Sequence, residues 1–161
     1  SMSGLIIRVA EAADAARLND ALRELSKDLN DVHRASNDDV ASAGFGPAPC
    51  FSALLAELDG DVAGVAVYSP FFSTTRGAPG VFVSDLWVAA SLRGSGVARS
   101  LLSGVCDFAA RQWGAAFLRL NVYHHNEAAI AAYEKLGFDA DHHERVMTLG
   151  IDNFDSLRAN T

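Results

Sequence analysis

The spacing of apolar side chains along the chain predicts alternating strands and helices. Residues 5–9 are mostly aliphatic and indicate a short first strand. Four leucines from Leu18 to Leu29 then recur every three or four residues, so they share one face of a helix whose opposite face is charged. Asp14 is suited to cap the start of that helix, and residues 37–40, which begin Asn-Asp-Asp, can cap a second, short helix.

Strand-type patterns dominate the middle of the chain. Residues 50–58 are apolar enough for either a helix or a strand, and the turn signal Asp59-Gly60-Asp61 separates them from a strand-like run at 62–69. Residues 70–80 contain prolines and glycines and predict a polar loop. Residues 81–88 are apolar on both faces, apart from Ser84 and Asp85, and predict a strand buried in a sheet. Strict alternation would place residues 81, 83, 85 and 87 together on one face.

Helix-type spacing returns after this strand. One apolar stripe predicts a helix that ends at Gly114, and its members are Val97, Leu101, Leu102, Val105, Cys106, Ala109 and Trp113. Residues 117–122 indicate another buried strand, and Asn126 can cap a helix that Gly137 ends. We expect residues 138–141 and 144–149 to form a closing pair of strands, and residues 152–161 a polar tail with room for one helical turn.

Composition narrows the class of protein. A chain of 161 residues, half of them hydrophobic, predicts one soluble domain over residues 1–161, with a core at about 5–150 and a tail at 151–161. The net charge of -7 argues against a nucleic-acid surface. No apolar run is long enough to span a membrane, no signal peptide follows Met2, and two cysteines make no disulfide framework. The cytoplasm is therefore the expected compartment.

A glycine-rich segment at residues 93–98 joins the buried strand to the helix after it. Gly94 and Gly96 let the backbone turn tightly and approach a ligand closely. The N–H groups at a helix start lack partners within the helix and bind anions, phosphates above all, and Arg93 adds a permanent cation. The spacing does not fit a dinucleotide fingerprint, because Arg99 stands where a third Gly or Ala is needed. A P-loop is excluded as well, since no Gly-Lys-Ser/Thr triplet is present.

Two motifs together resemble the GNAT superfamily of N-acetyltransferases. The first is Arg-Gly-x-Gly-x-Ala at 93–98, directly after a strand that ends Asp-Leu-Trp-Val. The second is Asn126-x-x-Ala129, followed by Tyr133-x-x-x-Gly137-Phe138. The resemblance implies an α/β fold of the α+β type, with a mixed, largely antiparallel sheet flanked by helices. Within that sheet it favours a hairpin of residues 50–58 and 62–69.

The resemblance also implies an activity. A GNAT enzyme moves an acetyl group from acetyl-CoA to a primary amine by direct attack in a ternary complex and needs no metal. The motifs here are most similar to those of the diamine acetyltransferase branch. Two alternatives stay open: an acyl-CoA-binding regulatory module with weak catalysis, and a peptide or protein N-acetyltransferase. The family commonly forms dimers, so we expect a homodimer.

The cofactor residues follow from the same resemblance. The pantetheine arm is expected along a strand edge that splays away from the next strand, and the pyrophosphate in the glycine-rich loop. Those residues are Leu86, Trp87, Val88, Arg93, Gly94, Ser95, Gly96, Val97 and Ala98. Asn126 and Ala129 are expected beside the cofactor as well. Tyr133 occupies the position of the family's general acid, and a phenol with a pKa of ~10 can protonate the leaving thiolate.

The resemblance does not identify the general base, because Ser84 stands where many GNAT enzymes have a glutamate. Asp85 follows it, but alternation points this carboxylate to the other face, where a structural role is equally plausible. His124, His125 or a chain of waters could take the proton instead. Adjacent histidines face opposite ways on a strand, so neither His124-His125 nor His142-His143 predicts a metal site.

Acidic side chains suggest the charge of the acceptor. The segment before Gly44, where the family builds part of its acceptor site, carries Asp28, Asp31, Asp38 and Asp39, so we expect a small, cationic primary amine. The alternative is that these aspartates cap helices and solvate the surface.

Overall fold

The computed structural model describes residues 3–160, and Ser1, Met2 and Thr161 lie outside the described residues. The chain divides into two compact units, with the boundary between Val122 and Tyr123. The first unit contains a sheet with helices on both faces, and the second contains two helices and an extended connection.

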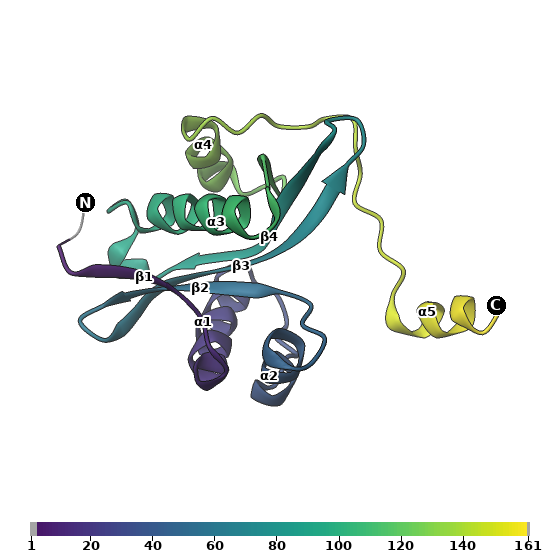
Figure 1. The fold of residues 1–161 in the computed structure, drawn as a ribbon, viewed down its shortest axis with the longest axis horizontal. Helices are drawn as coiled ribbons and strands as arrows, with labels where there is room; N and C mark the ends of the chain where they lie inside the picture. Colours follow the sequence, from purple (N-terminus) through teal and green to yellow (C-terminus); the bar gives the residue numbers. More distant parts are fainter. Residues whose placement is uncertain (1–2, 161) are drawn as a thin grey trace. The chain divides into compact units, whose positions relative to one another are not determined.

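One five-stranded sheet forms the centre of the described part of the first unit (Figure 1). Its strands are β1 (Leu5–Val9), β2 (Ser52–Leu58), β3 (Asp61–Ser73), β4 (Ala78–Val88) and β5 (Phe117–Leu120). They lie side by side in sequence order; β1 to β4 are antiparallel, and β5 runs parallel to β4. The mixed, largely antiparallel sheet and its β2–β3 hairpin are therefore confirmed.

Helices α1 (Ala15–Asp28) and α2 (Asn37–Phe45) cover one face of this sheet, and α3 (Val97–Trp113) covers the other (Figure 1). On the α1 face, Leu18 packs with Val65 and Val67 of β3 in one apolar cluster. On the α3 face, the buried Tyr68 ring stacks on Trp113 with centroids 6.3 Å apart. Five members of the predicted stripe of α3 are buried, Trp113 is half-buried, and Cys106 is exposed.

The prediction of a polar loop at residues 70–80 is wrong. β3 continues to Ser73 and β4 begins at Ala78, so the two strands form an arm that extends past the end of β2. Prolines pointed to a loop because they cannot donate to a ladder. Here Pro70 lies beyond Tyr68, the last residue of β3 that pairs with β2, so one edge of β3 is open and needs no donor.

A β-bulge interrupts the pairing of β3 with β4. Tyr68 lies opposite Val83, and Val67 lies opposite Asp85, so Ser84 is an extra residue on β4. Val83 thus shares the face of Tyr68 under α3, whereas Asp85 shares the α1 face with Val67. The single face predicted for residues 81, 83, 85 and 87 is therefore wrong, because alternation within one strand carries no signal for a bulge.

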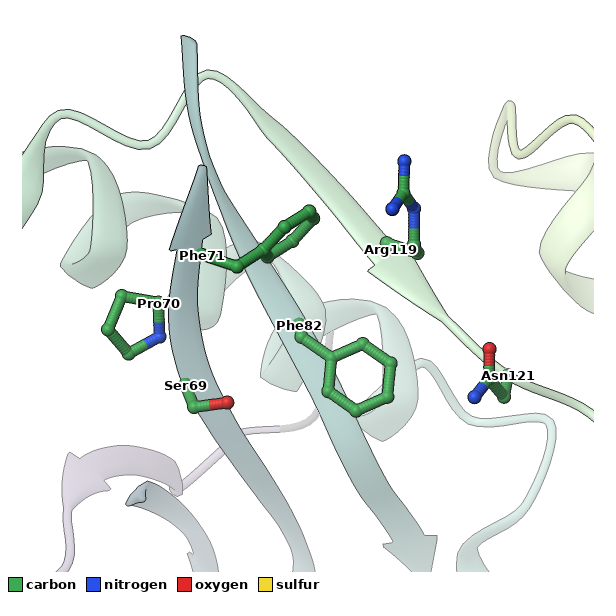
Figure 2. Close-up of a pocket in the computed structure, with 6 residues that line it drawn as sticks. All are labelled: Ser69, Pro70, Phe71, Phe82, Arg119 and Asn121. Carbon is green, nitrogen blue, oxygen red and sulfur yellow. The ribbon is translucent and has the colours of Figure 1, made fainter. Parts of the chain in front are cut away.

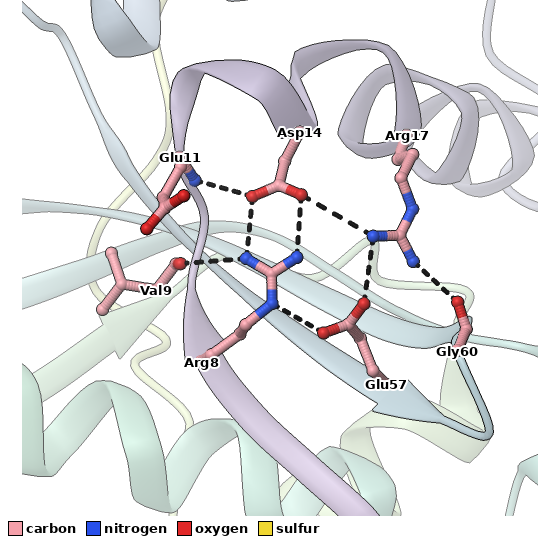
Figure 3. A network of polar contacts seen from close by, with 7 residues as sticks. All are labelled: Arg8, Val9, Glu11, Asp14, Arg17, Glu57 and Gly60. Carbon is pink, nitrogen blue, oxygen red and sulfur yellow. Dashed lines mark hydrogen bonds and ion pairs between the residues drawn. The ribbon is translucent and has the colours of Figure 1, made fainter.

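A network of charges joins β1, β2 and the start of α1 (Figure 3). Arg8 of β1 donates two hydrogen bonds of 2.8 Å to Asp14 and one of 2.6 Å to Glu57 of β2. Arg17 of α1 lies 3.0 Å from the same Glu57. Arg8 lowers the pKa of Asp14 to about 2. Asp14 is the residue before α1, as expected, but its side chain does not cap that helix; it accepts from Arg8 and from the Glu11 N–H instead.

Helix α2 begins at Asn37, and its N-cap is Ser36 rather than a residue of the predicted capping segment 37–40. The Ser36 hydroxyl accepts from the Asp39 N–H, and the Asp39 carboxylate accepts from the Ser36 N–H in return. Asp39 therefore belongs to the capping box at the start of α2, in line with the helix-capping alternative stated for it.

The second unit holds α4 (Glu127–Lys135) and α5 (Ile151–Arg158). The Asn126 side chain caps α4 by accepting from the Ala129 N–H at 3.3 Å, which confirms its structural role. The predicted strands at 138–141 and 144–149 are absent from the described residues of this unit. An isolated strand pair is marginal without a sheet or helix to pack on, and Asp141 instead accepts from the His143 N–H in a turn. The tail forms two turns of helix rather than one.

Candidate active site

The glycine-rich loop leads from the end of β4 into α3. Gly94 and Gly96 have φ of +79° and +96°, which only glycine adopts readily. A Cβ atom at either position would meet nothing within 4 Å. The Ser100 N–H donates the first α-helical bond, to Gly96, so the N–H groups of residues 97–99 precede the hydrogen-bonded ladder. The loop is therefore an open helix start that can bind an anion.

Close packing fixes the position of this helix start. Gly64 of β3 lies beneath it, and a Cβ there would come within 2.7 Å of the Trp87 carbonyl oxygen and 3.0 Å of Leu101. Only a residue without a side chain lets α3 approach the sheet this closely. The start of α3 thus lies directly over the β3–β4 pair.

Arg93 ties the loop to the end of α1. Its guanidinium Nη2 lies 2.5 Å from Asp28, and its Nε donates to the Val88 carbonyl at 3.1 Å. The Trp87 indole N–H also donates to Asp28, at 3.3 Å. Asp28 is therefore already paired with a cation, which weakens its predicted role in attracting a cationic acceptor.

The bulge brings Ser84 and Asp85 together. The Ser84 hydroxyl donates to the Asp85 carboxylate at 2.9 Å, so the expectation that Asp85 points away from Ser84 is wrong. Burial raises the pKa of the half-buried Asp85, while the Ser84 hydrogen bond and the nearby His33 act in the opposite direction. A carboxylate with a raised pKa is a stronger base than an exposed one.

His33 approaches this site from the segment between α1 and α2. Its Nδ1 lies 2.8 Å from the Ser26 hydroxyl, and its Nε2 lies 2.8 Å from Oδ1 of the fully buried Asn19. Asn19 donates its own amide hydrogens to Ala35 and Asn37, so its oxygen is the acceptor and His33 Nε2 carries a proton. No sequence pattern links His33 to Asp85; only the folded chain brings them into electrostatic contact.

β4 separates from β5 beside this carboxylate. Their ladder runs from Gly80 to Val83 on β4 and ends at Leu120 on β5, while β4 continues to Val88. The divergence that the family resemblance implies is thus present. The β4 edge from Ser84 to Val88 faces no β5 residue in the ladder, so those of its backbone groups that bond neither β3 nor Arg93 are available to a ligand.

A pocket of about 330 Å³ opens at this divergence (Figure 2). Three adjacent strands of the first unit and the residue after β5 supply its lining, which consists of Ser69, Pro70, Phe71, Phe82, Arg119 and Asn121. The sequence contains no indication of this pocket, because its residues lie far apart in the chain, and two of them, Pro70 and Phe71, fall in the segment that was expected to be a loop.

Tyr133, Asn126 and Ala129 belong to the second unit. The Tyr133 ring packs on Phe138 with centroids 5.4 Å apart, and burial raises the pKa of its phenol above 10. The hydroxyl is therefore protonated at neutral pH, as a general acid must be. In the same unit the His125 ring stacks on Tyr123.

Within residues 3–160, no group of three or more His, Cys, Asp or Glu side chains is placed to hold a metal ion. No helix in this range combines the length and apolar character that crossing a bilayer requires.

Comparison with known proteins decides the family. The model of a family described as the acetyltransferase (GNAT) family matches residues 18–138. The chain belongs to the GNAT acetyltransferase family. It is thus an N-acetyltransferase, as its two motifs predicted.

Individual relatives agree with this assignment. A thialysine N-epsilon-acetyltransferase of Bos taurus is 29% identical over 146 residues, which cover 84% of this chain and 85% of the relative. An integron cassette protein from V. cholerae has a TM-score of 0.81 at 19% identity, covering 98% of this chain and 99% of its own. An aminoglycoside N-acetyltransferase, AAC(6')-Iy, in complex with CoA has a TM-score of 0.75 at 20% identity, covering 94% and 97%. The two solved structures establish a shared fold.

Proposed function

We propose that this GNAT enzyme transfers the acetyl group of acetyl-CoA to a small primary amine in a ternary complex. The observation that carries the proposal is the open helix start at residues 94–99, placed directly after the β4 edge that diverges from β5. The loop would hold the CoA pyrophosphate, with Arg93 fixing its position, and the edge formed by Leu86, Trp87 and Val88 would hold the pantetheine arm.

The reaction needs a neutral amine and a protonated leaving group. In the proposed mechanism, Asp85 accepts a proton from the ammonium group, directly or through Ser84 or a water, and the nearby His33 favours the ionised carboxylate that accepts it. The amine nitrogen then forms a bond to the thioester carbonyl carbon. The carbon–sulfur bond breaks as the tetrahedral intermediate collapses, and Tyr133 donates its proton to the thiolate. The amide nitrogen then releases its remaining extra proton through solvent to the Tyr133 phenolate, which restores the acid. Asp85 thus takes the part that the missing glutamate plays elsewhere in the family.

The acceptor is expected to be small. The thialysine N-epsilon-acetyltransferase among the relatives supports an amine at the end of a short chain. Structural neighbours named as aminoglycoside acetyltransferases make polyamino sugars the second class to test.

The deciding experiment follows thiol release from acetyl-CoA while diamines, amino acids, aminoglycosides, arylamines and N-terminal peptides are added in turn. Turnover with at least one small amine, at a rate above acetyl-CoA hydrolysis, is the expected result. Tight acetyl-CoA binding without turnover of any amine would favour a regulatory acyl-CoA-binding module. A clear preference for peptides would favour a protein N-acetyltransferase.

A cytoplasmic homodimer is the expected form of the enzyme. Three large apolar side chains of α5, those of Ile151, Phe154 and Leu157, are 84%, 57% and 62% exposed in the single chain, which supports burial of this helix against a second subunit. Light scattering at micromolar concentration tests this expectation, and a monomer mass would contradict it.

A further inference from the structure

We infer that Arg99, in the first turn of α3, binds a phosphate group of CoA and supplies the cation for the glycine-rich loop. This inference rests on the proposed use of acetyl-CoA and adds a residue to its binding site. It also changes the part of Arg93, which was expected to be that cation. CoA carries a pyrophosphate and a 3′-phosphate on its ribose, and a guanidinium can bind either group.

The charge of Arg93 is already matched within the protein. Its Nη2 lies 2.5 Å from the Asp28 carboxylate, and its Nε donates to the Val88 carbonyl at 3.1 Å. A phosphate beside this ion pair would meet a carboxylate as well as a guanidinium, so the pair offers little net attraction. Arg93 thus ties the loop to α1, and residues 93–98 contain no second cation. In a chain with a net charge of -7, a polyanion such as CoA gains most from a local unpaired cation.

Arg99 carries an unmatched charge at an unfavourable place. It is exposed, and no carboxylate, hydrogen-bond acceptor or aromatic ring contacts its guanidinium in the part of the chain that the structure describes. It is the third residue of α3, and the free N–H groups of this first turn give the helix end a partial positive charge. The turn contains no acidic residue, and its N-cap, Gly96, has no side chain to accept from these groups.

A cation at the positive end of a helix is unfavourable for the protein alone. It becomes favourable when an anion binds there, because the anion then interacts with the N–H groups and with the guanidinium at once. Residues that contradict a local structural preference without compensation within the fold are expected at functional sites. The position of Arg99 is therefore explained by a ligand and not by the fold.

The backbone of α3 brings the Arg99 side chain to the loop. Every Cα–Cβ bond of an α-helix tilts toward the helix N-terminus, so a side chain covers the turn before its own residue. Arg99 is three residues from Gly96, or about 4.5 Å along the helix axis. Val97 and Leu101 form the buried face of this turn. Arg99 therefore lies on the solvent side, next to the open space that the loop glycines leave.

Calorimetry with CoA and with 3′-dephospho-CoA tests the inference on Arg99→Gln. The variant should bind CoA at least about tenfold more weakly, the usual effect of losing a charged hydrogen bond. An equal loss for both compounds would assign Arg99 to the pyrophosphate, and a loss for CoA alone would assign it to the 3′-phosphate. Unchanged affinity for CoA would overturn the inference.

Arg111→Gln is the matched control. Arg111 lies in the last turn of the same helix, where the dipole favours a cation, and it pairs with Asp107 at 2.7 Å. The substitution removes the same charge at the far end of α3, so CoA affinity should not change. An equal loss of affinity in both variants would mean that overall charge, and not a contact of Arg99, attracts CoA.

The stability of the free protein gives a second readout with the opposite sign. Arg99→Gln should leave the melting temperature unchanged or raise it, because it removes a cation from a positive helix end. Arg111→Gln should lower the melting temperature slightly. Weaker CoA binding in an Arg99→Gln protein that also melts at a lower temperature would assign Arg99 to the fold and overturn the inference.

Other outcomes separate this inference from the proposed function. If no amine is acetylated but CoA binding still depends on Arg99, the phosphate contact stands and acetyl transfer fails. If amines are acetylated and Arg99→Gln binds CoA normally, the phosphate contact is wrong and acetyl transfer stands. Failure of the unaltered protein to bind CoA would overturn both.

Discussion

The Ser84 hydroxyl donates a 2.9 Å hydrogen bond to the Asp85 carboxylate, and both residues owe this contact to the bulge that one of them creates. The bulge places a titratable group on the α1 face of β4, beside the pocket and beside the strand edge that leaves β5. A carboxylate in such a place either supports the fold or serves the reaction, and these roles predict opposite effects on stability.

Asp85→Asn separates the two roles. Burial raises the pKa of Asp85, so folding disfavours its ionised form, and the ionised carboxylate at neutral pH costs stability instead of adding it. We therefore expect Asp85→Asn to lower kcat by about 10²–10⁴-fold while leaving the free energy of unfolding at pH 7 unchanged or higher. Chemical denaturation and steady-state kinetics measure the two effects on the same preparation.

Ser84→Ala is the companion variant. The Ser84 hydrogen bond lowers the pKa of Asp85, so its loss should move the acid limb of the kcat profile to higher pH with a smaller loss of maximal rate.

A destabilised but fully active Asp85→Asn protein would assign Asp85 to the structure and leave His124, His125 or water as the base.

Asp14 predicts a pH dependence of stability that is independent of catalysis. Its pKa of about 2 in the folded chain lies below the ordinary value of 3.8, because the Arg8 guanidinium favours the carboxylate. The resulting stabilisation is complete above about pH 5 and disappears as the pH falls toward 2. Asp14→Asn should lower the free energy of unfolding by about 2 kcal/mol at pH 7, and the difference should shrink steadily below pH 4.

Asp20→Asn is the control for that experiment. Asp20 pairs with Arg23 on the exposed side of α1, where solvent screens the interaction, so little change is expected. Equal stability losses for the two variants across the whole pH range would show that loss of general charge, and not the Arg8 network, is responsible.

Local patterns predicted the parts of this fold that depend on one segment at a time. β1, the β2–β3 hairpin and α3 follow from periodicity, turn residues and the family resemblance, and Asn126 caps α4 as its residue type suggests. The prediction of a closing strand pair failed because it depends on more than one segment. A strand is stable only beside a partner or a packing surface, and its own sequence does not show whether one is present.

The candidate site was predictable only in part. The glycine-rich loop could be recognised from the sequence, because a backbone with positive φ favours a residue without a Cβ. The orientation of Asp85 depends on how β3 pairs with β4, and the position of His33 depends on its contacts with Asn19 and Ser26. Such relations between distant segments leave no pattern in a single sequence.

Tyr133→Phe tests the proposed acid. The substitution keeps the ring that packs on Phe138 and removes only the hydroxyl, so the second unit should remain folded. We expect kcat to fall by about 10²–10⁴-fold with little change in the Kd for acetyl-CoA. Because burial raises the pKa of this phenol, its ionisation should not limit the activity of the unaltered enzyme near neutral pH. Tyr123→Phe, a hydroxyl loss in the same unit, should retain activity, and a fully active Tyr133→Phe would leave Tyr133 a packing role alone.

Gly96→Ala tests whether the loop holds the CoA pyrophosphate, and Gly114→Ala is its matched control. Both glycines border α3, have positive φ (+96° and +74°) and leave open space where a Cβ would point. Each alanine should therefore cost about 1–2 kcal/mol of backbone strain.

The open space at Gly96 lies at the helix start, where a phosphate would approach the free N–H groups, whereas the open space at Gly114 lies at the other end of α3. Calorimetry should show acetyl-CoA affinity at least about tenfold weaker for Gly96→Ala and unchanged for Gly114→Ala. Equal affinities in two folded variants would mean that the loop is only a turn, since strain without ligand contact cannot distinguish the two ends of one helix.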